Sequence, residues 1–272
     1  MRTKNPRPRE VISPSNALVK VFRRALAEGS TKQGWLAVEG PFLVEEALNA
    51  APIVKTHSVL VADGAADRFS TLLQRLPPEA EVTHVPDRLF VGVAQTQSPQ
   101  GVAALVELPA YKLDDVLTGA HPLLVVACRL QDPGNLGTIM RSALAFSATA
   151  FLTLQETVSP FNPKAVRSSA GAIFRLPLVC GLDAKKVLPY LSRRMRIVAA
   201  ERHSPASLSQ ADLTGPLAIL IGREATGLPE EFARYAGQLL SIPIRREIDS
   251  VNAATAASIF LYEAARQRGF KY

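Results

Sequence analysis

Three short segments in the second half of the chain carry the polar residues and glycines whose spacing could do chemistry. They cover residues 132–141, 221–228 and 242–252. Each one follows an apolar run that is expected to form a strand and leads into a turn or a helix. Because ligands in open α/β sheets bind in the crevice outside the carboxyl ends of the strands, three such segments in one domain predict a built binding site.

The first segment predicts a turn at residues 132–134 and a helix that Asn135 is well suited to cap. Arg141 lies six residues further on and is expected on a different face of this helix from the apolar Ile139 and Met140. A solvated arginine on an amphipathic helix fits the position, and so does a guanidinium fork aimed at a phosphate. We favour the phosphate interpretation.

The second segment follows a strongly apolar strand and contains two glycines. Gly222 would permit a ligand to approach the backbone closely, Gly227 would permit a positive φ, and Glu224 lies between them. The segment lacks the glycine spacing of a dinucleotide-binding fold and that of a P-loop. Neither class of nucleotide cofactor is therefore supported.

The third segment has Ile242 and Pro243 after a strand, then a charged loop, then Ser250 and Asn252 before a long alanine-rich helix. Ser250 could act as the helix cap. Alternatively, Ser250 and Asn252, with an arginine upstream, could contact a ribose and its phosphate. A serine hydrolase is a poor interpretation, because the chain has no G-x-S-x-G elbow and no histidine near these segments.

Composition narrows the choice of partner. The chain has 272 residues, of which 47% are hydrophobic, a net charge of +7 and a pI near 9.6. The positive charge favours an anionic partner, most commonly nucleic acid. The two cysteines are expected to be buried and reduced, and the four scattered histidines predict no metal site. No apolar run is long enough for a membrane span, so we expect a cytoplasmic protein.

The order of expected elements predicts two α/β domains. A basic flexible tail occupies residues 1–14, an α/β domain 15–108, a linker 109–120, and a second α/β domain 121–272. Alternating strands and helices in the second domain predict a parallel sheet that is covered on both faces. Its strands are expected at residues 123–127, 150–154, 195–200, 217–221 and 239–242, and its helices from about residue 135 and at 164–174 and 252–268.

Together the three segments resemble the signature motifs of the SpoU (TrmH-like) family of RNA ribose 2′-O-methyltransferases. Ile244 and Val251 replace a methionine and a leucine that are usual in the family, and both swaps conserve apolar character and size. The first domain resembles, more loosely, the ribosomal-protein-like RNA-binding domain of this family. The matching motif residues are Asn135, Gly137, Arg141, Ile221, Gly222, Glu224, Gly227, Leu228, Ile242, Pro243, Ser250 and Asn252, with residues 261–267 in the last helix.

The resemblance implies a deep trefoil knot, which is an exception to the rule that chains do not thread loops. It also implies a homodimer that binds S-adenosylmethionine in the knot, against the backbone around Gly222, Ile242 and Val251. It places Arg141 at the target ribose, close to its phosphate. In the same way it assigns the shaping of the catalytic pocket to four further residues: Asn135, Glu224, Ser250 and Asn252.

The resemblance further implies methyl transfer to a ribose hydroxyl. Arginine is a poor base for this step because it stays protonated at ordinary pH, so we expect Arg141 to clamp the phosphate while that phosphate or a water accepts the proton. A binding protein without catalysis, a knotted base methyltransferase and a plain α/β module remain alternatives. The substrate is expected to be a structured RNA, with 23S ribosomal RNA favoured over tRNA.

Overall fold

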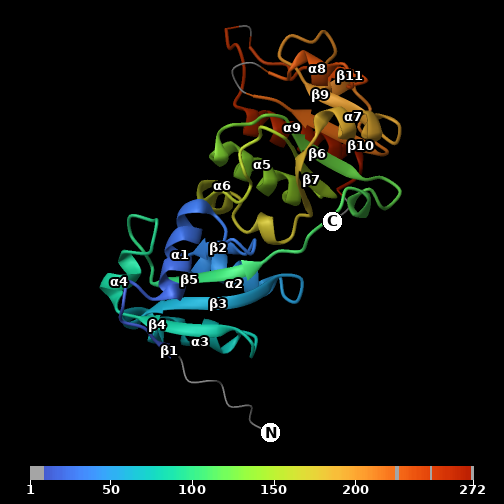
Figure 1. Cartoon of the computed structure of the whole chain (residues 1–272). Helices are drawn as coiled ribbons and strands as arrows, with labels where there is room; N and C mark the ends of the chain where they lie inside the picture. Colours follow the sequence, from blue (N-terminus) through green and yellow to red (C-terminus); the bar gives the residue numbers. More distant parts are fainter. Residues whose placement is uncertain (1–8, 224–226, 246, 271–272) are drawn as a thin grey trace. The chain divides into compact units, whose positions relative to one another are not determined.

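The computed structural model in Figure 1 describes residues 9–223, 227–245 and 247–270. Most of the basic residues expected in the tail fall in residues 1–8 and so lie outside the described residues. The chain divides into two compact units, Met1–Pro109 with Phe161–Arg167, and Ala110–Pro160 with Ser168–Tyr272. None of the described helices is both long enough and apolar enough to cross a bilayer.

The first unit is built on a mixed five-stranded sheet in the order β1-β4-β3-β5-β2. Its first helix shows why the sequence folds as it does locally, because the Asn16 side chain caps the helix at the N–H of Leu18 and Gly29 ends it in the left-handed region, with φ 98°. The elements are β1 (Arg9–Glu10), α1 (Ala17–Glu28), β2 (Leu36–Glu39), α2 (Pro41–Asn49), β3 (Lys55–Ala62), α3 (Ser70–Gln74), β4 (Glu81–Val85), α4 (Asp87–Val91), β5 (Val102–Glu107), most of α6 (Pro163–Ser168), and the 3₁₀ turns Asp63–Ala65 and Asp67–Phe69.

The second unit is built on a six-stranded sheet in the order β11-β9-β10-β6-β7-β8, with every pair parallel. All the carboxyl ends of its strands therefore lie at one edge. The elements are β6 (Leu123–Ala127), α5 (Pro133–Ala145), β7 (Ala150–Leu154), β8 (Leu178–Leu182), α7 (Ala184–Ser192), β9 (Arg196–Ala200), β10 (Leu217–Ile221), α8 (Glu230–Ala233), β11 (Gln238–Leu240), α9 (Ala253–Gln267), and the 3₁₀ turns Asp114–Val116, Ala172–Phe174 and Leu208–Gln210.

The expectation for the second domain is confirmed in its central strands. β6, β7 and β10 have the expected bounds, and each is buried at every position, as a sheet covered on both faces requires. The single helix expected over residues 164–174 is wrong. α6 ends at Ser168, because Ala170 and Gly171 have φ angles of 48° and 85° and break the helical path.

Helices α5 and α9 pack against each other in this unit (Figure 1). The hydroxyls of Ser142 on α5 and Ser258 on α9 lie 2.7 Å apart. Ser258 donates its own hydrogen to the carbonyl of Ala254, so Ser142 is the donor of the hydrogen bond between the helices. Two segments that are 116 residues apart in sequence are thus joined beside the sheet.

The C-terminal end of α9 is tied to the loop before β10 and to the start of β6. Arg268, which caps the helix, donates to the carbonyls of Leu213 at 3.1 Å and His121 at 2.8 Å, and also to that of Gly215. Gln267 adds a bond from its Nε2 to the carbonyl of Ala211 at 2.9 Å. One half-buried guanidinium therefore satisfies three backbone acceptors.

Replacing Arg268 with alanine is expected to lower the free energy of unfolding by about 2–3 kcal/mol, because half-buried carbonyls lose a charged donor. Urea unfolding followed by circular dichroism would measure this. Arg266→Ala is the matched control. Arg266 is itself exposed and pairs with Glu263, which keeps a second partner in Gln267, so this substitution should cost less than about 1 kcal/mol. Equal losses for the two variants would show that the three carbonyl bonds add no stability of their own.

Candidate functional site

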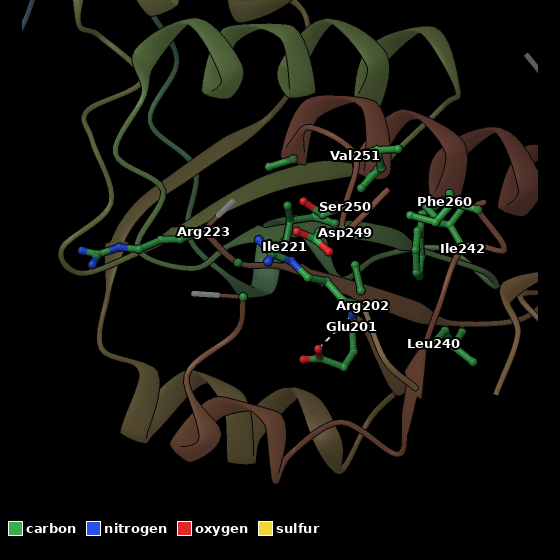
Figure 2. Close-up of a pocket in the computed structure, with 16 residues that line it drawn as sticks. Glu201, Arg202, Ile221, Arg223, Leu240, Ile242, Asp249, Ser250, Val251 and Phe260 are labelled. Carbon is green, nitrogen blue, oxygen red and sulfur yellow. Dashed lines mark hydrogen bonds between the residues drawn. The ribbon is translucent and has the colours of Figure 1, made fainter. Parts of the chain in front are cut away.

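The carboxyl ends of β9, β10 and β11 surround a pocket in the second unit (Figure 2). Gly222, Ile242 and Val251, the three residues that the resemblance assigns to the cofactor, all line it. Phe260 and Leu240 add buried apolar wall. The pocket thus combines an apolar wall with backbone groups of loops, which suits a ligand that has both a flat apolar part and polar edges.

A tight hairpin after β10 forms one side of the pocket. Arg223 and Gly227 exchange two backbone hydrogen bonds of 3.0 and 2.9 Å, and Gly227 has the expected positive φ, at 66°. Gly222 also has a role within the chain itself. A Cβ atom there would lie 2.4 Å from the carbonyl oxygen of Gly227, so glycine is needed for close approach by the chain itself. Glu224, which was expected in the catalytic pocket, lies outside the described residues.

The third segment brings Ser250 to the pocket and assigns the helix cap to Asn252. The Oδ1 atom of Asn252 accepts from the N–H groups of Ala254 at 2.8 Å and Thr255 at 3.3 Å. The cap role considered for Ser250 is therefore wrong, and Ser250 lines the pocket instead. The remaining Nδ2 of Asn252 donates to Oδ1 of Asn135 at 3.0 Å. This bond joins the first segment to the third.

The cap expected for α5 also moves by three residues. Asp132 caps the helix, because its carboxylate accepts from the N–H of Asn135 at 2.8 Å. The side chain of Asn135 is thereby left to meet Asn252. Pro133 occupies the first helical position, where its missing N–H costs nothing, so residues 133–134 belong to the helix and not to the turn that was expected there.

Arg141 lies on the exposed side of α5, whereas Ile139 and Met140 are fully buried, which confirms the expected face. Its guanidinium makes no hydrogen bond or ion pair with any of the residues that the structure describes. Arg141 is not among the residues that line the pocket. Arg141 is therefore exposed and separate from the pocket's wall.

Arg129, which sequence reasoning missed, organises the loops behind the site. It follows β6 with a positive φ of 56°, and its backbone N–H donates to the Thr157 hydroxyl at 2.9 Å. Its guanidinium pairs with Glu156 at 3.1 Å and with Glu231 at 3.0 Å, and it lies 4.9 Å from the centre of the Phe232 ring. The signal in the sequence was a charged residue two positions after a buried strand.

The cysteines give no support for a nucleophile in this unit. Cys128 is fully buried at the end of β6, and burial raises the pKa of its thiol, so it stays protonated. Cys180 is exposed on the edge strand β8, so its expected burial is wrong. Among the residues that the structure describes, no three His, Cys, Asp or Glu side chains are grouped to hold a metal ion.

Comparisons with known proteins agree with the geometry. Residues 122–262 match the model of the SpoU rRNA Methylase family. The chain is 32% identical over 217 residues to the 23S rRNA (uridine(2479)-2′-O)-methyltransferase of Streptomyces viridochromogenes. The aligned residues cover 77% of this chain and 76% of that protein. In structure it is similar to the SpoU methyltransferase AviRb of the same organism in complex with AdoMet, with a TM-score of 0.83, 28% identity and coverage of 94% and 100%. It is also similar to the AdoMet-bound rRNA methyltransferase from Sinorhizobium meliloti, with a TM-score of 0.81, 29% identity and coverage of 96% and 98%.

Proposed function

The chain belongs to the SpoU rRNA methylase family, and from this membership we propose that it methylates a ribose 2′-hydroxyl of 23S ribosomal RNA. It is an RNA 2′-O-ribose methyltransferase that uses S-adenosylmethionine, and its second unit has the knotted fold of the family. The observation that carries the proposal is the bond between Asn135 and Asn252, which joins two motifs beside the pocket.

The residues of the pocket fit S-adenosylmethionine. Apolar side chains such as Ile242 and Phe260 offer a surface for an adenine ring. Gly222 lets the chain close into the Arg223–Gly227 hairpin, because a Cβ atom at this position would lie 2.4 Å from the carbonyl oxygen of Gly227. When bound, the cofactor supplies an electrophilic methyl carbon on a sulfonium. The contribution of the protein is to hold the ribose hydroxyl in line with that carbon.

Arg141 is the residue that we propose positions the target ribose. Its guanidinium is exposed and unpaired among the described residues, so both of its outer nitrogens are available for a phosphate. A bidentate contact fixes the sugar next to that phosphate, and the phosphate or a water accepts the proton of the hydroxyl. Arginine itself does not take the proton, because it remains charged at any ordinary pH.

Asn135 and Asn252 act as one unit in the proposed site. The Oδ1 of Asn252 is committed to the cap of α9, so its Nδ2 must point to Asn135. This contact fixes the orientation of the Asn135 amide. Asn252 is therefore a positioning residue, and its effect on the ribose passes through Asn135. Ser250 lies at the pocket wall and could contact the substrate or the cofactor directly.

Asn252→Asp separates capping from this positioning role. A carboxylate still caps a helix, so the free energy of unfolding should change by less than about 0.5 kcal/mol. It has no N–H to donate, so the Asn135 amide should turn over, and methyl transfer should fall by about tenfold or more. Single-turnover methylation and urea unfolding would measure the two effects. Asn252→Ala, which also removes the cap, should lose about 1 kcal/mol of stability in addition. Unchanged methylation by the aspartate variant would refute the role of the contact.

We also propose that the enzyme acts as a homodimer and that its first unit binds the RNA substrate. The overall charge of +7 supports a polyanionic partner. A 23S ribosomal RNA is preferred to tRNA because the relative from Streptomyces viridochromogenes is named for 23S rRNA.

The function is tested with full-length protein, radiolabelled S-adenosylmethionine, and unmodified 23S ribosomal RNA or tRNA in separate reactions. Labelled RNA is then digested with alkali. A 2′-O-methyl group removes the hydroxyl that attacks the next phosphate, so label in an uncleaved dinucleotide is the expected result, and the labelled RNA names the class of substrate. Label on single nucleotides would mean base methylation. Label in tRNA alone would refute the ribosomal assignment.

A further inference from the structure

The hairpin that closes the pocket also has an outer face, and we propose that Arg223 on this face binds a phosphate of the RNA strand that carries the target nucleotide. This assignment rests on the RNA methyltransferase function proposed above, and it adds a second arginine to the substrate contacts. In Figure 2 the side chain of Arg223 extends away from the labelled pocket residues Ile242, Leu240 and Phe260.

The backbone and the side chain of Arg223 serve opposite faces of the hairpin. Its backbone makes both hydrogen bonds to Gly227 and so holds the wall of the pocket. Its Nε donates to the carbonyl of Arg129 at 2.8 Å. The outer nitrogens, Nη1 and Nη2, form no hydrogen bond or ion pair with the part of the chain that the structure describes. They are the two atoms that bind a phosphate in bidentate fashion.

The support for Arg223 is rigid, which favours a binding role. The carbonyl that it contacts belongs to Arg129, whose backbone is held by Thr157 and whose guanidinium is held by Glu156 and Glu231. A guanidinium that is anchored at Nε loses little further freedom when its outer nitrogens bind a ligand.

The unused donors of Arg223 favour an anion as the ligand. Arg129 already has two carboxylate partners, whereas Arg223 and Arg141 have no carboxylate partner among the described residues. Arg223 follows β10 and Arg141 lies on the helix after β6, and these two strands are neighbours in the sheet. A nucleic acid backbone is the ligand that repeats negative charges along one line, and it can meet both arginines.

The carboxylate of bound S-adenosylmethionine is also an anion and is the alternative ligand for Arg223. The direction of the side chain argues against this ligand, because it leaves the pocket. Binding of S-adenosylmethionine is therefore measured beside binding of RNA. The variant is Arg223→Ala in the full-length protein, and the control is Arg193→Ala. Arg193 is an exposed arginine that just precedes β9, at the edge of the sheet opposite the pocket.

RNA binding is measured by filter retention of an unmodified 23S ribosomal RNA transcript over a series of salt concentrations. Arg223→Ala is expected to weaken binding about tenfold at low salt. The slope of log affinity against log salt should fall by about 0.7–0.9, which corresponds to one phosphate contact. The affinity for S-adenosylmethionine, measured by calorimetry, should stay within about twofold. Arg193→Ala should leave the salt slope unchanged.

Three results would overturn the assignment: a wild-type salt slope for Arg223→Ala, an equal fall of the slope for Arg193→Ala, or a large loss of cofactor affinity. A large loss of cofactor affinity would show that Arg223 contacts the cofactor and not the RNA. Failure of the proposed function is seen separately, as wild-type protein that transfers no label to the RNA. The salt slopes remain measurable in that case, so the two failures can be told apart.

Discussion

Replacing Arg141 with lysine is expected to lower the rate of methyl transfer about 100-fold while the affinity for S-adenosylmethionine stays the same. Lysine keeps the charge but offers a single point of contact, so the phosphate can rotate and the ribose hydroxyl leaves the line of attack. A displacement of the reacting hydroxyl by about 1 Å can lower the rate of the reaction by two orders of magnitude. Cofactor affinity should be kept because Arg141 does not line the pocket.

Single-turnover methylation with saturating RNA measures the chemical step, and calorimetry measures the cofactor. The matched control is Arg193→Lys, the same substitution at an exposed site on the other edge of the sheet, which should change neither quantity. A rate within a few-fold of wild type for Arg141→Lys would show that a bidentate clamp is the wrong description. Charge alone would then account for the role of Arg141.

Replacing Gly222 with alanine is expected to reduce the affinity for S-adenosylmethionine at least about 100-fold. The added Cβ would lie 2.4 Å from the carbonyl oxygen of Gly227 and 2.7 Å from the backbone nitrogen of Leu228. Backbone atoms cannot turn aside as a flexible side chain can, so the hairpin must open. Because Gly222, Arg223 and Gly227 all line the pocket, opening the hairpin changes the shape of the cofactor site itself.

Gly237→Ala is the control for this substitution, because its Cβ would meet its nearest neighbour, the carbonyl of Ile197, at an ordinary 3.7 Å. Neither glycine has a positive φ, so the two substitutions differ mainly in the clash. Calorimetry gives the cofactor affinity, and thermal unfolding reports whether either variant loses its fold. Near-normal cofactor binding by a folded Gly222→Ala variant would show that the shape of the hairpin does not set the pocket.

The central strands of the second unit were predictable because burial on both faces leaves an uninterrupted apolar run, as in β6 and β10. β8 is an edge strand with exposed positions at Cys180 and Gly181, so its pattern does not stand out, and it was not predicted. α7, which follows it, was missed as well and contains Pro189, a residue that sequence rules read as a helix breaker.

The residues of the pocket wall could be predicted from the motifs, whereas the helix cap and the contacts of Arg129 could not. The family resemblance named Gly222, Ile242 and Val251 for the cofactor, and all three line one pocket. The helix cap was predicted at Ser250, whereas Asn252 caps α9, because both side chains suit that role and only the backbone path decides. Arg129 and its partners Glu156 and Glu231 lie on three separate loops or helices, and no local pattern connects them.

The bond between Asn135 and Asn252 spans 117 residues and therefore sets the order in which activity can be acquired. Chains are synthesised from the N-terminus, so α5 exists long before Asn252, Val251 and Phe260 have been made. Until then the cofactor pocket lacks a wall and Asn135 lacks its partner. A growing chain therefore has neither a complete cofactor pocket nor the Asn135–Asn252 contact until the residues that begin α9 have been made.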